Sequence, residues 1–290
     1  MNAPIETTRP SGTAILRLSE DAYHADPCEM PSLTQSIAHT LVSKSPAHAW
    51  LEHPRLGGKA RKPTKTMDAG TLVHKLILGV GCDVEIIEHD SYRTKAAQEL
   101  RDLARAEGKL PMLAHEYAEI DAAVAGIRAR MEHKGIVFSG ESEVTIIWQE
   151  EARDGTTVQC RGRMDHVLLD AGHIYDLKTS RSAHPDKCAS AIYEYGYDIQ
   201  AAAYMRALGQ ARPMLEGRIK FTDLFVETDE PYPVSPIRHA GTMRELGERR
   251  WRKAVNLWAK CLNENWWPDY TETPVYVDAR PWHLDEASSF

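Results

Sequence analysis

The sequence predicts a mixed α/β fold of the α+β type, in which a helical N-terminal half precedes a small mixed β-sheet flanked by helices. Two observations support this expectation. Apolar residues recur at helical spacing up to about residue 135, and from Ile136 the pattern changes to short segments rich in strand-forming residues. We therefore expect helices first, then a three-stranded meander, and then helix, strand and helix.

The N-terminal half should contain four helical segments, over residues 33–51, 67–78, 94–107 and 112–134. The first should kink or restart at Ser45-Pro46, because proline is tolerated in the first turn of a helix but not in its interior. Thr66 is placed to cap the second helix. Gly135 should end the fourth.

The second half should contain strands over residues 143–149, 158–169, 173–179 and 219–227. The turn Asp170-Ala171-Gly172 joins the second and third of these into a hairpin. One helix is expected over 188–208, before the fourth strand. Another is expected over 242–264, where Trp251, Val255 and Trp258 recur at helical spacing.

The chain of 290 residues is long enough to bury a substantial core. Residues 1–17 are expected to form a flexible N-terminal tail, because their start is polar and contains proline and does not resemble a signal peptide. Residues 18–290 should form a single domain. Its parts are a helical region (18–135), a catalytic core (136–230) and a C-terminal helix with a tail (231–290).

Composition narrows the functional classes. A hydrophobic content of 42% and a charged content of 27% are ordinary for a globular protein. The net charge of -7 argues against a protein that coats polyanions, although an acidic site beside basic patches can bind DNA once a metal is present. Five scattered cysteines indicate reduced thiols and a cytoplasmic protein. No apolar run approaches the roughly 18 residues of a membrane span.

The predicted hairpin carries the most informative residues. Asp165 ends the run Gly162-Arg163-Met164-Asp165, and Asp176-Leu177-Lys178 begins eleven residues later. Asp176 and Lys178 are two apart and should share a face of their strand. Phosphodiester hydrolysis needs carboxylates that hold a divalent metal and a cation near the attacking water. The alternative is two ordinary strand-end aspartates with an ion pair to Lys178, and the short patterns alone do not separate the two interpretations.

Other residues add context. Glu143 opens the neighbouring strand and is preferred over Glu141 as a third acid for hard metal ions. Gln200 and Tyr204 share one face of the predicted helix, where they could orient a ligand or simply pack. His74 lies on an apolar helix, where a histidine is either a metal ligand or a hydrogen-bonded core residue.

In this order, the residues resemble the motifs of the PDDEXK nuclease superfamily in its RecB-like form. The motifs are Gly70-Thr71-x-x-His74, Glu143, Gly162-Arg163-x-Asp165, Asp176-x-Lys178 and Gln200-x-x-x-Tyr204. Together with Ser43–His48, they are most similar to the C-terminal nuclease domain of RecE. The resemblance covers roughly residues 18–262 and implies a restriction-endonuclease-like core.

The resemblance also implies an activity. It suggests a Mg²⁺-dependent exodeoxyribonuclease, with Mn²⁺ able to substitute, that degrades linear double-stranded DNA from 5′ to 3′. The 3′ single-stranded tails would serve annealing-type recombination of a phage or prophage. It further implies a single-strand annealing protein as partner and a ring-shaped homo-oligomer, a tetramer by resemblance.

The same resemblance assigns roles to the site residues. His74, Asp165 and Asp176 become metal ligands, with Glu143 as a further acid. Lys178 would orient the attacking water and stabilise charge on the phosphate. Gln200 and Tyr204 would steady the site. Candidate contacts to DNA phosphates are Arg161, Arg163, Arg55, Lys59, Arg61 and Lys62.

Three alternatives remain open from the sequence. The same site could belong to an endonuclease or a structure-specific nuclease. The chain could also be a catalytically silent scaffold that binds DNA ends, although all candidate ligands and the lysine are present together. An iron–sulfur RecB-like nuclease would need four clustered cysteines, which the scattered thiols supply poorly.

Overall fold

The structure, a computed structural model, describes residues 12–59 and 64–287. Its centre is a six-stranded sheet in the order β1-β4-β5-β6-β7-β8. The strands are β1 (Ala14–Leu16), β4 (Glu141–Glu151), β5 (Thr157–Leu168), β6 (His173–Thr179), β7 (Lys220–Val226) and β8 (Val234–Ile237). All neighbours are antiparallel except β6 and β7, which are parallel. The predicted mixed sheet flanked by helices is therefore confirmed.

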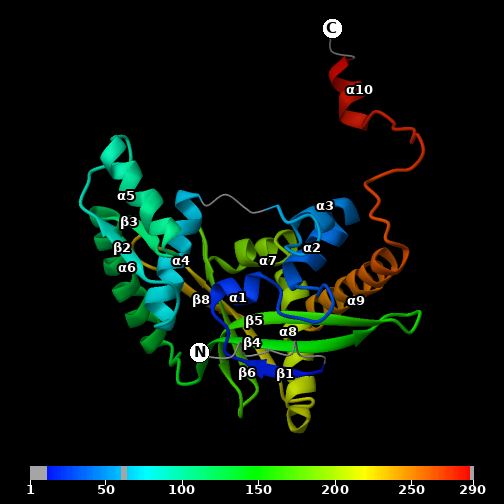
Figure 1. The fold of residues 1–290 in the computed structure, drawn as a ribbon, viewed down its shortest axis with the longest axis horizontal. Helices are drawn as coiled ribbons and strands as arrows, with labels where there is room; N and C mark the ends of the chain where they lie inside the picture. Colours follow the sequence, from blue (N-terminus) through cyan, green and yellow to red (C-terminus); the bar gives the residue numbers. More distant parts are fainter. Residues whose placement is uncertain (1–11, 60–63, 288–290) are drawn as a thin grey trace, which may run out of the picture.

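Helices cover both faces of the sheet (Figure 1). One face packs on α2 (Gln35–Ser43), α8 (Tyr197–Ala211) and α9 (Gly241–Glu264), around the buried Trp148, Trp251 and Trp258. The other face packs on α4 (Lys65–Leu78) and α6 (Ala114–His133) through Leu177 and Leu224. Because side chains alternate along a strand, β6 sends Leu177 to the α4 side and its neighbours Asp176 and Lys178 to the α8 side.

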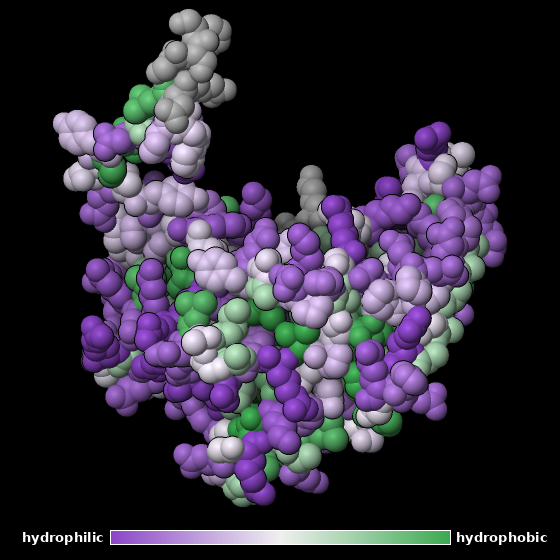
Figure 2. All heavy atoms as spheres, turned by 180° about the vertical axis from the view of Figure 1, so that it is seen from behind, coloured by the Kyte–Doolittle hydropathy of each residue, from purple (hydrophilic) through white to green (hydrophobic). Residues whose placement is uncertain are grey.

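Smaller elements complete the molecule. They are α1 (Glu20–His24), α3 (Pro46–Glu52), β2 (Val84–Ile87), α5 (Lys95–Ala106), β3 (Leu110–Leu113), α7 (Pro185–Glu194), η1 (Pro213–Leu215) and α10 (Pro281–Ala287). Strands β2 and β3 form a separate parallel pair. In Figure 1 this pair lies with α4, α5 and α6 on the left, and α10 stands away from the body. In the view from behind, apolar side chains form separate patches among polar ones (Figure 2).

Helix starts follow local capping chemistry, with one correction. The predicted break at Ser45-Pro46 is confirmed, because α2 ends at Ser43 and Ser45 caps α3. The prediction that Thr66 caps α4 was wrong. The helix begins earlier, and Thr64 accepts the hydrogen bond from the Met67 backbone N–H at 3.3 Å.

The helix expected over 188–208 is in fact two helices, α7 and α8. They are separated at Gly196, whose φ of 73° lies in the left-handed region. The His39 ring also packs there, and its Cδ2 would lie 2.6 Å from an added Cβ. Only glycine satisfies both constraints. The break makes Tyr197 the first residue of α8.

Short strands were the other difference from expectation. The expected flexible tail, 1–17, contains β1, which pairs Ala14 with Ile147, while residues 1–11 lie outside the described part. Met112 and Leu113, expected at the start of a helix, belong to β3. Among the described helices, none combines the length and apolar character needed to cross a membrane.

A buried carboxylate joins the sheet to two helices. Glu150 of β4 is 2% exposed and accepts hydrogen bonds from the indoles of Trp148 at 3.0 Å and Trp251 at 3.3 Å. Arg206 of α8 binds both its oxygens at 2.7 Å, and Arg252 of α9 adds a bond at 3.0 Å. Burial alone would raise the pKa of Glu150, but the bonds from Arg206 outweigh it and lower the pKa.

We predict that Glu150→Ala destabilises the fold, because it leaves two arginines and two indole N–H groups without their acceptor. Removing one partner of a fully buried pair costs about 3–5 kcal/mol, but here we expect about 2–3 kcal/mol, since water reaches both arginines. Urea unfolding measures the difference. The exposed neighbour variant Glu151→Ala is the control and should change stability by less than about 0.5 kcal/mol. Equal stability of the two variants would contradict the assignment.

Candidate active site

The site lies where β5 and β6 separate. Their pairing covers His166–Leu168 of β5 against His173–Tyr175 of β6. Beyond it, the Leu177 backbone N–H donates to Asp165 Oδ2 at 2.8 Å, and the Leu177 carbonyl accepts from His74 Nε2 at 2.9 Å. Side chains thus replace the backbone groups of a neighbouring strand. This arrangement fixes Asp165 and His74 at the opening of the sheet.

His74 is held as a cation in this arrangement. Its Nδ1 donates to the Gly70 carbonyl at 2.9 Å, and its Nε2 faces the Leu177 carbonyl and Asp165 Oδ2 at 3.3 Å. These oxygens only accept, so both ring nitrogens carry protons. Burial alone would lower the pKa of His74, but the bond to Asp165 and the charge of Asp165 raise it to about 9. Metal binding by His74 therefore requires loss of a proton.

Glu143 lies across the strand pair from Asp165. The registered pairs Ser142–His166 and Val144–Met164 flank it. Its φ of 57° lies in the left-handed region, which is unusual for a residue with a Cβ. Its carboxylate forms an ion pair with Arg163, and burial is the main cause that raises its pKa.

Glu141, which we had placed second to Glu143, lies at the start of the same strand. Its side chain is 47% exposed and forms an ion pair with Arg17. It does not line the cleft that contains Asp165 and Glu143. The structure therefore brings Glu143, and not Glu141, beside Asp165.

Asp176, Lys178 and Gln200 form a buried group on the α8 side. Gln200 Nε2 donates to Asp176 Oδ1 at 2.7 Å, and Lys178 Nζ donates to Gln200 Oε1 at 2.7 Å and pairs with Asp176. The predicted shared face of Asp176 and Lys178 is confirmed. Burial, followed by the negative charge of Asp165, raises the pKa of Asp176 to about 7 despite the lysine.

Tyr204 explains the glycine of the Gly162-Arg163-x-Asp165 motif. Its ring packs on Gly162, where an added Cβ would lie 2.5 Å from Cε1. Its hydroxyl donates to the Arg163 carbonyl at 2.9 Å. Tyr204 therefore holds the strand that carries Asp165 against α8.

Two residues beside the site were not singled out from the sequence. Asp223 of β7 is paired in register with Asp176 and accepts from His239 at 2.7 Å. The sequence feature that could have indicated Asp223 is an acidic residue inside a mostly apolar strand. Tyr197 places its ring centroid 3.8 Å from Lys178 Nζ, which no local pattern reveals.

Three of the predicted ligands, His74, Glu143 and Asp165, line a cleft of about 400 Å³ between α4 and the sheet, together with Arg163. The fourth, Asp176, lies buried behind this cleft with Lys178, on the α8 side of the sheet. A second hollow of about 720 Å³, bordered by α1 and by the turn before β3, shares Glu143 and Arg163 with the cleft. The two hollows therefore adjoin at the Glu143–Arg163 ion pair. Each of these two volumes is in the range of protein sites that bind small ligands.

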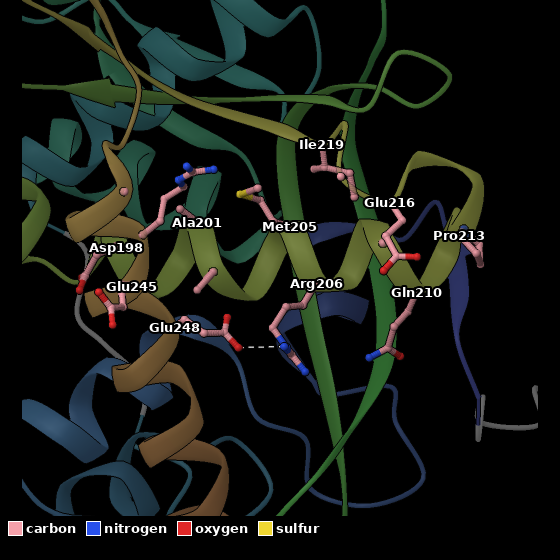
Figure 3. A pocket seen from close by; sticks show the side chains of 15 residues that line it. Asp198, Ala201, Met205, Arg206, Gln210, Pro213, Glu216, Ile219, Glu245 and Glu248 are labelled. Atoms are coloured by element: carbon pink, nitrogen blue, oxygen red, sulfur yellow. Dashed lines mark hydrogen bonds and ion pairs between the residues drawn. The ribbon is translucent and has the colours of Figure 1, made fainter.

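Another hollow, of about 740 Å³, lies between α8, η1 and the start of α9 (Figure 3). Ala201 and Met205 lie along its α8 wall, and Arg206 and Glu248 bridge it with an ion pair at 2.8 Å. None of the predicted metal ligands lines it, and neither does Lys178. The candidate active site is therefore the acidic cleft.

The carboxylates of the site are the kind of ligand that a hard divalent cation binds, although each forms an ion pair with a positively charged side chain of the protein. Across residues 12–59 and 64–287, no three His, Cys, Asp or Glu side chains are arranged to hold a metal. Asp176 faces Lys178, Glu143 faces Arg163, and His74 is protonated. Carboxylate oxygens are nevertheless the ligands that Mg²⁺ prefers, and the mutual repulsion of Asp165 and Asp176 favours a cation there.

The basic residues expected to contact DNA are placed differently from one another. The expectation for Arg161 is corrected, because its side chain is 3% exposed and pairs with the buried Asp26 at 3.0 Å, out of reach of a phosphate. Arg163 lines the cleft. Arg55 donates to the Cys28 carbonyl at 2.6 Å and stays partly exposed, and Lys59 is exposed. Arg61 and Lys62 lie outside the described residues.

Comparison with known proteins identifies relatives of the fold. Residues 36–280 match the family described as a PDDEXK-like domain of unknown function (DUF3799). The crystal structure of a "putative exonuclease" from Eubacterium rectale has a TM-score of 0.62 and 13% identity, covering 95% of this chain and 100% of that one. A phage related exonuclease from Haemophilus somnus 129PT has a TM-score of 0.33 and 12% identity, covering 81% and 96%. No curated protein matches the chain.

We predict that Gly162→Ala destabilises the protein, because the new methyl group meets the Tyr204 ring. Overpacking of this kind costs about 1–3 kcal/mol. Gly241→Ala is the control, since its added Cβ would meet nothing within 4 Å. Thermal unfolding of both variants measures the effect. A Gly162→Ala protein as stable as the control would show that Tyr204 does not pack as described.

Proposed function

Since the chain belongs to the DUF3799 family of PDDEXK-like domains, we propose that it is a nuclease that hydrolyses DNA phosphodiester bonds with a divalent metal. One observation carries the proposal. Asp165, Asp176, Glu143, His74 and Lys178 come from four elements, β5, β6, β4 and α4, and lie around the point where β5 and β6 part. Buried acids, a histidine and a lysine in one place are costly for stability and typical of a catalytic site.

Asp165 and Asp176 would hold the metal, with Glu143 and His74 as further ligands. Mg²⁺, or Mn²⁺ in its place, would supply Lewis-acid stabilisation of the phosphate and activation of water. To do so, His74 would have to lose a proton, and the metal would compete with Arg163 for the carboxylate of Glu143.

The remaining residues act on the phosphate and on each other. Lys178 supplies a positive charge beside Asp176, where it can stabilise negative charge on the phosphate and orient the attacking water. Gln200 keeps both partners in place through its two bonds at 2.7 Å. Arg163 lines the cleft and can bind a backbone phosphate without reading sequence.

The proposed substrate is the end of linear double-stranded DNA, degraded from 5′ to 3′ so that 3′ single-stranded tails remain for annealing-type recombination. This part rests on the resemblance of the ordered motifs to RecE. The description of the E. rectale protein as an exonuclease concerns that protein and agrees with the proposal. A single-strand annealing protein, a ring-shaped homo-oligomer and a cytoplasmic location belong to the same proposal.

We predict that Asp176→Asn and Lys178→Ala each reduce degradation of linear duplex DNA by at least about a hundredfold, because the first removes a carboxylate that would hold the metal and the second removes the positive charge that acts on the phosphate. The assay follows end-labelled duplex with Mg²⁺ and, as a control, with EDTA. Asp170→Asn, in the exposed turn of the same hairpin, is the matched carboxyl-to-amide control and should digest DNA like the wild type. Unchanged digestion by either site variant would remove the catalytic assignment.

A second prediction concerns the ends of the substrate. An exonuclease should leave supercoiled plasmid intact while it degrades the same plasmid after linearisation. On duplexes blocked at one 5′ end, degradation should start from the unblocked 5′ terminus. Comparable cutting of supercoiled and linear DNA would instead support an endonuclease, and release of nucleotides from the 3′ end would reverse the proposed polarity.

A further inference from the structure

The ammonium group of Lys178 has a third neighbour that the nuclease motifs do not include. Besides Asp176 and Gln200, the ring of Tyr197 lies against it, with its centroid 3.8 Å from Nζ. A cation this close to an aromatic face is attracted by the electrons of the ring, and the attraction is larger where water is excluded. The Lys178 side chain is 11% exposed, so most water is excluded here.

The fold places Tyr197 there through the break between α7 and α8. Gly196 turns the chain with its left-handed conformation, so that α8 starts at Tyr197. Tyr197, Gln200 and Tyr204 are then separated by three and four residues and share one face of the helix. All three contact the strands that carry the site: Tyr197 and Gln200 at Lys178, and Tyr204 at the Arg163 carbonyl.

The Tyr197 ring is also held from behind. It packs on an apolar cluster that contains Ile192 and Phe225, and its centroid is 6.1 Å from that of Phe225. The ring is therefore a fixed wall of the lysine pocket. An ammonium group has three N–H bonds and no acceptor. Two of its neighbours are the acceptors Asp176 and Gln200, and the aromatic face is the third.

We propose that Tyr197 is a positioning residue for Lys178, which it keeps directed toward Asp176 and Gln200. The proposal rests on the nuclease function proposed above. An aromatic face attracts the ammonium without accepting a proton from it, so it fixes the position of the charge and leaves it free to act on the phosphate. A lysine without this wall would be a strongly hydrated charge on a flexible stem, free to turn toward water.

The test compares Tyr197→Leu, which removes the ring, with Tyr197→Phe, which keeps the ring and removes the hydroxyl. Both are assayed with Mg²⁺ on linear duplex DNA. We expect Tyr197→Leu to lower kcat by about 3- to 30-fold with little change in KM, the range that follows from the strength of cation–aromatic contacts. Tyr197→Phe should restore most of kcat, since the ring is present.

A structural readout in metal-free protein tests the contact itself. The ring should shift the NMR signals of the Lys178 ε-methylene group upfield in the wild type and in Tyr197→Phe, and Tyr197→Leu should lose the shift. Val255→Ala is the packing control, because Val255 is fully buried in the separate cluster around the tryptophans, which does not include Tyr197 or Lys178. It should lower the unfolding temperature while kcat and the upfield shift remain.

Each result bears on the proposal. An equal loss of kcat in the Phe and Leu variants would assign the effect to the hydroxyl. An equal loss in Val255→Ala would assign it to general loss of stability. Either result overturns the proposal. So would an unchanged kcat in Tyr197→Leu. If the wild type does not degrade DNA at all, the proposed function fails, and the NMR comparison still decides whether the ring holds Lys178.

Discussion

The structure depends on the burial of two carboxylates, Asp165 and Asp176, on neighbouring strands at the place where those strands separate. Each negative charge raises the free energy of the other, and burial adds to the cost. The fold compensates from both sides of the sheet. On one side, His74 of α4 contacts Asp165. On the other, Asp176 is held by Lys178 of its own strand and by Gln200 of α8. Each of the two helices thus supplies a polar partner for one carboxylate, while their apolar faces pack on the sheet.

Several unfavourable local features support the same arrangement. Glu143 adopts a left-handed backbone conformation opposite Asp165, Gly162 admits the ring of Tyr204, and Gly196 breaks a helix that would otherwise continue. Each lowers intrinsic stability, and each brings a side chain to the opening between β5 and β6. Strain and buried charge concentrated at one place are the expected mark of a functional site. Apolar burial around the tryptophan-rich core and the Glu150 network offsets these costs elsewhere.

What the sequence could predict was set by the range of the interactions involved. Strand β6 was predicted with its observed limits, and candidate site residues could be proposed because their order and spacing are properties of the chain itself. The break at Gly196 was missed because the apolar pattern continues across this residue, and the contact with His39 that also requires a glycine there is distant in sequence. Arg161 was misplaced for the same reason, since its partner Asp26 belongs to another segment. Periodicity predicts which face of a strand is buried, but not which charged residue from a distant segment will contact that face.

The pairing of every acid with a protein cation bears on how the site could work. Asp176 Oδ2 pairs with Lys178, so a metal bound by this oxygen would compete with the lysine for its charge. A lysine anchored by Asp176 alone would lose its position at that moment. Here Lys178 keeps two further neighbours, Gln200 Oε1 and the ring of Tyr197, and both lie on α8 and not on the strand that carries the acid. The lysine can therefore stay in place while Asp176 exchanges partners, which joins metal binding and charge stabilisation in one site.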